Sequence, residues 1–172
     1  MDQYYSWDRY FMTIAYLVGM KSKDPSTRVG AVIVTSDNEI ISTGYNGLPR
    51  NVHDKSVRYT NKDYKYLSLN HAEENAILHC AKNGISVKGS SMFTPWIPCA
   101  RCTKSIIQVG ITQIIYDTSF PGNDIKNQDN NWAQSINISV ELLAEANIGI
   151  RKFTGKLISI TGLYKGKEFY LS

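Results

Sequence analysis

The sequence predicts a layered α/β domain with a partly parallel sheet. Segments with apolar residues at helical spacing alternate along the chain with short apolar runs that are typical of strands. At 172 residues, the chain is long enough for one domain with a sizeable core. Its hydrophobic content of 42% and charged content of 20% are ordinary for a globular protein. We therefore expect a single domain over 1–172, with a core over about 7–153 and a C-terminal extension over 154–172.

The N-terminal part is expected to form a helix followed by two strands. In Trp7–Met20, aromatic and aliphatic residues recur at helical spacing behind Ser6, which suits an N-cap. Val29–Thr35 and Ile40–Tyr45 have the composition of strands and are joined by the turn "SDNE". The segment 47–70 is polar with interspersed tyrosines, and we expect a long surface excursion there.

The later part of the chain alternates between helices and strands. The helix expected over His71–Asn83 has an apolar face and ends before Gly84, a common C-terminal stop. A polar loop is expected over Thr118–Asn131. The other expected elements are strands Ser90–Thr94, Gln113–Tyr116 and Ile148–Phe153, helices Ala100–Val109 and Ser135–Ala146, and a hairpin within Lys156–Ser172 that turns at "YKGK".

Charge and hydropathy favour a cytoplasmic protein without a membrane or nucleic-acid partner. The net charge of +4 is mild, and no block of like charges suggests a nucleic-acid surface. No apolar run reaches the roughly 18 residues of a membrane span, and the polar, aromatic start does not have the pattern of a signal peptide. The chain has three cysteines, an odd number, which argues against a disulfide framework and for a reducing compartment.

The stretch "PWIPCARC" holds two of the three cysteines, Cys99 and Cys102, at the expected start of a helix. By itself the pair fits a redox dithiol, half of a zinc site, or a pair without any special function. A further ligand is available from "HAE", where His71 opens another expected helix and Glu73 follows two residues later. If the two helices pack side by side, His71 and the two thiolates meet at their N-termini, where the partial positive charge favours thiolates.

One nitrogen and two sulfur ligands leave the fourth position of a tetrahedral zinc open. An open position is typical of a catalytic site, because zinc lowers the pKa of water to about 7 in favourable sites. Glu73 is then placed to carry protons rather than to bind the metal. The pattern H-x-E followed by P-C-x-x-C matches the signature of the zinc-dependent nucleobase deaminases.

The chain resembles the deoxycytidylate (dCMP) deaminases from about Trp7 to Phe153. The matching segments are "SKDPSTRVGAVIV", "GYNGLPR", "HAEENAI", "PCARCTKSIIQVGI" and "LLAEANI". The resemblance implies a three-layer αβα sandwich around a mixed five-stranded sheet of the cytidine deaminase type. It also implies hydrolytic conversion of dCMP to dUMP and ammonia, which would supply thymidylate synthesis. A homo-oligomer, commonly a hexamer and otherwise a dimer, and allosteric control by dCTP and dTTP, with Mg²⁺ accompanying the effector, are further implications.

The resemblance also assigns roles to individual residues. His71, Cys99 and Cys102 match the zinc ligands, and Glu73 matches the proton shuttle that takes a proton from water and protonates N3 and the leaving amino group. Asn46 matches a residue that contacts the nucleoside. Backbone groups of Ala72 and Cys99 are expected beside the pyrimidine edge.

The chain departs from the family pattern at two places. Before "HAE" it offers only His53 and no cysteine, so we expect one zinc per subunit and no second metal. In addition, "TPWIPC" replaces a more usual threonine-rich approach to Pro98, and Trp96 could stack on the base or simply pack in the core or an interface.

Several residues have competing interpretations. Asn46 beside Gly47 could satisfy a turn instead of contacting substrate. Arg28 could hold the substrate phosphate, because a guanidinium matches phosphate oxygens, and it competes with other basic residues for that role. Cys80 lies on the apolar face of its expected helix and is interpreted as a core residue. The competing basic residues are Lys23, Arg50 and Arg58.

Two alternative functions remain open from the sequence. One is deamination of another cytosine or adenine substrate, such as dCTP, a nucleoside or a polynucleotide, although the mild charge disfavours a polynucleotide. The other is an inactive, zinc-stabilised accessory protein, for which Glu73 would have no purpose.

Overall fold

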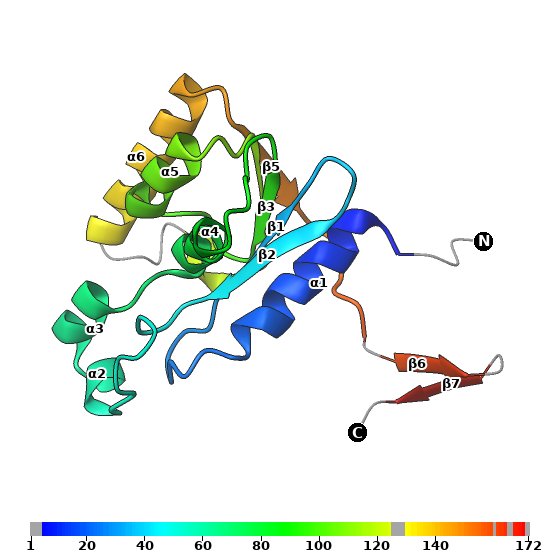
Figure 1. The fold of residues 1–172 in the computed structure, drawn as a ribbon, viewed down its shortest axis with the longest axis horizontal. Coiled ribbons are helices and arrows are strands. Elements are labelled where there is room, and N and C mark those ends of the chain that lie inside the picture. Colours follow the sequence, from blue (N-terminus) through cyan, green and yellow to red (C-terminus); the bar gives the residue numbers. More distant parts are fainter. Residues whose placement is uncertain (1–4, 125–129, 160, 165–166, 171–172) are drawn as a thin grey trace.

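The fold is built on a mixed five-stranded sheet (Figure 1). The computed structural model describes residues 5–124, 130–159, 161–164 and 167–170. Across the sheet the strand order is β2-β1-β3-β4-β5; β1 runs antiparallel to both β2 and β3, whereas β3, β4 and β5 are parallel. The strands are β1 (Gly30–Val34), β2 (Ile40–Tyr45), β3 (Ser91–Thr94), β4 (Gln113–Asp117) and β5 (Gly149–Phe153).

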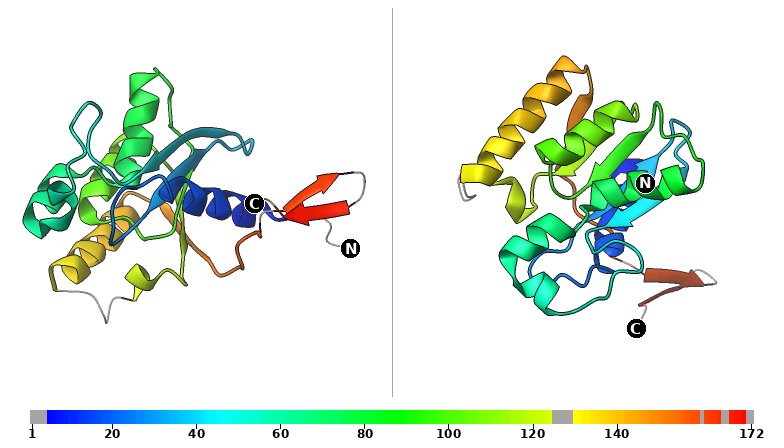
Figure 2. Two further views of the ribbon diagram at one scale, coloured as in Figure 1. Left: turned by 90° about the horizontal axis from the view of Figure 1, so that it is seen from below. Right: turned by 60° about the vertical axis from the view of Figure 1, so that its left-hand side comes forward.

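Helices cover both faces of the sheet and make three layers (Figures 1 and 2). Helix α1 (Trp7–Gly19) packs on one face, and α4 (Ala72–Lys82), α5 (Ala100–Gln108) and α6 (Asn130–Glu145) lie on the other. Strand β1 is buried on both faces: Val32 and Val34 join the α1 cluster, and Ala31 and Ile33 join the cluster under α4 and α5. The predicted three-layer αβα sandwich is confirmed.

The segment 47–70 is more ordered than the sequence predicts. It contains two short helices, α2 (Val57–Thr60) and α3 (Lys62–Ser68), and its ends are joined by a bridge between Gly47 and Asn70. Asn61 caps α3 by accepting a hydrogen bond from the Tyr64 amide at 3.0 Å. The sequence shows no apolar periodicity for these helices, because capping and local side-chain hydrogen bonds stabilise them rather than a row of buried apolar residues.

Helix α6 begins at Asn130 instead of Ser135. Its first turns are polar, so hydrophobic periodicity does not locate the start of the helix. Trp132 in these turns nevertheless packs against the core. The loop before it includes a short 3₁₀ turn, η1 (Pro121–Asn123). At the C-terminal end, β6 (Thr161–Tyr164) and β7 (Lys167–Tyr170) form an antiparallel pair that projects away from the sheet (Figure 1); residues 165–166 of the expected turn lie outside the described residues. Within the described ranges, no helix has the length and apolarity of a bilayer-crossing segment.

Helix α4 lies directly on β2 because Gly44 has no side chain. A Cβ atom added there would lie 2.3 Å from the carbonyl oxygen of Ala72 and 2.3 Å from the amide nitrogen of Ala76. Both are backbone atoms of α4, so they cannot move without moving the helix. Gly44 therefore sets the distance between α4 and the sheet, and with it the position of the first residues of this helix.

We expect Gly44→Ala to lower the free energy of unfolding by about 1–3 kcal/mol, because overpacking forces α4 away from the sheet. Urea denaturation measures the change. The matched control is Gly47→Ala, since a Cβ there would meet only the Tyr45 ring, at 3.6 Å. Equal stability of the two variants would contradict the close approach.

Candidate metal centre and active site

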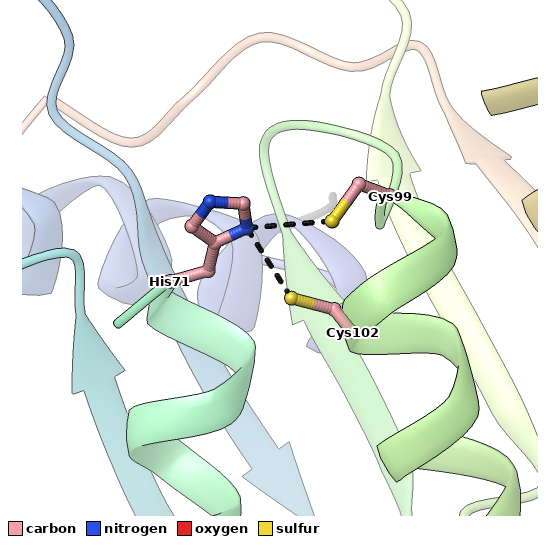
Figure 3. Close-up of side chains that lie close together, drawn as sticks. All are labelled: His71, Cys99 and Cys102. Atoms are coloured by element: carbon pink, nitrogen blue, oxygen red, sulfur yellow. Dashed lines mark hydrogen bonds between the residues drawn. The ribbon is translucent and has the colours of Figure 1, made fainter. Parts of the chain in front are cut away.

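The three metal-binding candidates come together at the N-terminal ends of α4 and α5 (Figure 3). His71 is the N-cap of α4 and Cys99 is the N-cap of α5, both with extended backbone, and Cys102 lies in the first turn of α5. The N-terminus of α5 is also tied to α6, because the Ala100 amide donates to Ser135 Oγ at 3.1 Å. The two helices therefore start side by side, as the interpretation of the sequence required.

The geometry of this group fits a zinc ion. Nδ1 of His71 lies 3.4 Å from Sγ of Cys99 and 3.4 Å from Sγ of Cys102, and all the ligand atoms are within 4.8 Å of one another. Zinc–sulfur bonds of about 2.3 Å and zinc–nitrogen bonds of about 2.0 Å at tetrahedral angles place nitrogen and sulfur about 3.5 Å apart. Both cysteines are free thiols and both are buried. The donor set and its nitrogen–sulfur spacing thus fit zinc.

The electrostatics of the thiols favour one thiolate before any metal binds. Hydrogen bonding from Cys102 and from the His71 ring, against the effect of burial, lowers the pKa of Cys99 to about 4. The pKa of Cys102 is raised well above its ordinary value, because it donates its proton to Cys99 and is itself buried. The Cys99 interaction also raises the pKa of His71. A metal cation bound by His71, Cys99 and Cys102 would replace the protons that these three side chains share in hydrogen bonds.

Glu73 is a buried carboxylic acid beside this group. Its residue is 5% exposed and lines the same cavity as His71 and Cys99. Burial raises the pKa of Glu73 to about 7, and the negative charge of Cys99 acts in the same direction, while His71 opposes it. A carboxyl group with a pKa near neutrality can accept and release a proton at physiological pH.

A cavity of about 160 Å³ adjoins the group. Trp96 and Trp132 form an aromatic wall, with ring centroids 4.5 Å apart, and the Trp132 ring is 6.3 Å from the His71 ring. The loop that holds Trp96 is fastened by Asn123, which accepts from the Ile97 amide at 2.9 Å and donates to the Pro95 carbonyl at 2.9 Å. The lining residues are Asp24, Ser26, Thr27, Val29, Asn46, Lys65, Tyr66, Leu69, His71, Ala72, Glu73, Trp96, Ile97, Cys99 and Trp132.

Asn46 lines the cavity, but its amide group is engaged within the protein. Its Oδ1 accepts from the Val29 amide at 2.9 Å, and its Nδ2 donates to the Thr27 carbonyl at 2.9 Å and to Asp24 at 3.3 Å. These bonds join the segments "SKDP" and "GYNG", which are far apart in the sequence. Asn46 therefore has a structural role between two segments, and its contact with the nucleoside stays a prediction.

The structure separates the other candidates. Ala72 and Trp96 line the cavity as well, whereas Arg28 is not among the lining residues, and its Nε donates to the Asp24 carbonyl at 3.3 Å. Glu74 forms an ion pair with Arg101 at 2.9 Å, across α4 and α5. Cys80 is buried in the core, as predicted.

Lys65 and Trp132 are among the cavity residues that sequence reasoning missed. Lys65 lies on α3, inside a segment that was expected to be an irregular excursion, so nothing in the sequence brings it near the "HAE" motif. Trp132 is on the first turns of α6, between the loop expected over Thr118–Asn131 and the helix expected from Ser135. A lone tryptophan in a polar segment was the available signal for the second residue, since such a residue is seldom left in solvent.

The comparisons with known proteins agree with this geometry. Residues 5–118 match the family model described as the cytidine and deoxycytidylate deaminase zinc-binding region. The chain is 39% identical over 164 residues to deoxycytidylate deaminase of Homo sapiens, covering 92% of this chain and 86% of that protein.

Solved structures show the same relationship. The dCMP deaminase from the cyanophage S-TIM5 in apo form matches with a TM-score of 0.64 at 26% identity, over 85% of this chain and 96% of that one. The same enzyme in complex with dCMP and dUMP matches with a TM-score of 0.64 at 25% identity, over 84% and 94% of the two chains. The chain therefore belongs to the cytidine and deoxycytidylate deaminase family defined by its zinc-binding region.

Proposed function

We propose that this protein catalyses the hydrolytic deamination of dCMP to dUMP with release of ammonia, supplying dUMP for thymidylate synthesis. The observation that supports it most directly is the convergence of His71 Nδ1 with both cysteine sulfurs beside the buried Glu73. The choice of dCMP is supported by the relatives, because the human protein is named deoxycytidylate deaminase and the cyanophage enzyme binds dCMP and dUMP.

In this proposal His71, Cys99 and Cys102 hold one zinc ion per subunit. Zinc bound there would supply Lewis-acid polarisation of a water molecule. The carboxylate of Glu73 accepts a proton from the water that adds to C4 of the cytosine. The same carboxyl group then donates that proton to N3. It next takes the second proton from the hydroxyl group now on C4 and passes it to the amino group, which leaves as ammonia while C4 becomes a carbonyl. A pKa of about 7 suits this carboxyl group to both directions of transfer.

The remaining cavity residues position the base. The Ala72 amide lies in the first turn of α4, where a helix offers N–H groups without an intrahelical acceptor, and it can donate to the pyrimidine edge together with the backbone of Cys99. Trp96 and Trp132 provide aromatic faces beside the metal ligands. Deamination replaces the amino group of the base by a carbonyl group and changes only the edge near Glu73. The faces of the ring stay the same, so the two tryptophans can also accommodate the product.

Other expectations stay predictions. They are the homo-oligomer, the control by dCTP and dTTP with Mg²⁺, and the cytoplasmic location. Light scattering during gel filtration measures the oligomeric state directly.

We expect Glu73→Gln to reduce dCMP turnover by roughly 10²- to 10⁴-fold, because the amide cannot carry the proton. Turnover is followed by the loss of cytosine absorbance, and zinc content by elemental analysis. Glu74→Gln is the matched control, because Glu74 is the next residue and lies in an ion pair with Arg101. Unchanged turnover in Glu73→Gln with zinc retained would defeat the proposed shuttle, and turnover of single-stranded DNA but not dCMP in the wild type would reject the substrate.

Zinc content should follow the three ligands. We expect Cys99→Ser and Cys102→Ser to lose most of their zinc and their activity, and removal of zinc with a chelator to abolish turnover until zinc is returned. Cys80→Ala should keep one zinc per chain, because Cys80 lies in the core away from the group. Full zinc occupancy after loss of either sulfur would contradict the ligand assignment.

A further inference from the structure

Lys65 is a cation in the active-site cavity for which the deamination chemistry has no use. Its side chain is 15% exposed, and among the described residues that line the cavity it is the only lysine or arginine. It comes from α3, and its ammonium group contacts Asp24 and Ser26, in the segment that precedes β1, rather than the His71 group. Its place in the cavity therefore calls for a separate explanation.

The ammonium group of Lys65 is held in a fixed position. Nζ lies 2.6 Å from Oδ2 of Asp24 and 2.7 Å from Oγ of Ser26. An ammonium group has three N–H donors, so one donor remains after these two acceptors among the described residues. Because α3 and the segment before β1 both line the cavity, a ligand in the cavity can reach this group.

Asp24 does not depend on Lys65 for its hydrogen bonds. Its Oδ1 accepts from the Ser26 amide at 2.9 Å, from Ser26 Oγ at 2.9 Å and from the Thr27 amide at 3.3 Å, and its Oδ2 also accepts from Asn46 at 3.3 Å. Burial opposes the ionisation of Asp24, but Lys65 and Ser26 outweigh it and lower its pKa. The carboxylate is thus ionised and saturated, and it keeps the neighbouring ammonium charged and oriented.

We propose that Lys65 binds the 5′-phosphate of the nucleotide and so determines the preference for a nucleotide over a nucleoside. Asp24 and Ser26 are positioning residues that aim its ammonium group. A compact cation with a spare N–H suits a phosphate monoester, whose dianion needs a charge-assisted hydrogen bond inside a protein. This role replaces the one that the sequence suggested for Arg28. The inference rests on the proposed function, since it concerns the substrate of the same site.

The test compares two substrates in one protein preparation. For Lys65→Met we expect kcat/KM for dCMP to fall roughly 10- to 100-fold, the range of a lost hydrogen bond to a charged group, while kcat/KM for deoxycytidine is unchanged. The ratio of the two values does not depend on how much of the sample is folded, because both substrates use the same active molecules. Lys82→Met is the matched control, because it removes a charge from the exposed face of α4 outside the cavity, and it should leave the ratio unchanged.

A second variant guards against misfolding. Lys65→Gln keeps a donor for Asp24 and Ser26 but carries no charge, so it should show the same selective loss for dCMP. If either variant loses activity on dCMP and deoxycytidine equally, Lys65 is a structural residue and the inference fails. If both variants instead keep the wild-type kcat/KM for dCMP, the inference is overturned as well.

Failure of the proposed function would be seen separately. If the zinc-loaded wild type deaminates neither substrate, the reaction is wrong, but calorimetric titration with dUMP and with deoxyuridine still tests Lys65. Selective weakening of dUMP binding in Lys65→Gln would support the phosphate site, and equal affinity for dUMP in the variant and the wild type would reject it.

Discussion

The meeting of two helix N-termini is the constraint on which the rest of the structure depends. The ligand atoms of His71, Cys99 and Cys102 converge because α4 and α5 start side by side on the same face of the sheet. Gly44 lets α4 rest on β2, and Ser135 of α6 caps the first turn of α5. A shift of either helix by an ångström would separate nitrogen from sulfur, so packing far from the metal ligands decides whether they form one site.

The helix starts also determine the electrostatics of the site. Unpaired N–H groups in the first turns and the partial positive charge there favour a thiolate at Cys99 and a metal-bound form of both sulfurs. Glu73 lies in the same first turn of α4, and the helix end would favour its ionised form. Burial and the charge of Cys99 act against that and raise the pKa of Glu73 to about 7. The same short segment therefore holds a metal-binding group and a carboxyl group that can exchange a proton near neutral pH.

Most of the fold and the metal-binding group could be predicted from the sequence, for physical reasons that differ between elements. Helix α1 and strand β1 bury regular apolar stripes, so periodicity locates them. The metal-binding group is predictable because only a few residue types bind zinc, and His71 and the two cysteines stand at helix starts. Helix α3 and the first turns of α6 are polar and are held by capping and by single contacts such as that of Trp132. Periodicity says nothing about such segments, which is why Lys65 and Trp132 were missed.

The structure also changes the meaning of the two motifs that linked the chain to its family. "SKDP" and "GYNG" are joined by the bonds of Asn46 to Asp24, Thr27 and Val29. Asp24 in turn forms an ion pair with Lys65 of α3, and both residues line the cavity. One part of the cavity wall is thus formed by three segments, which are "SKDP" with the residues after it, "GYNG" and α3. Another part is formed by "HAE" and "PCARC". Recognition of the base and of the group attached to its sugar would then depend on different parts of the chain, which could vary independently while the deamination chemistry stays the same.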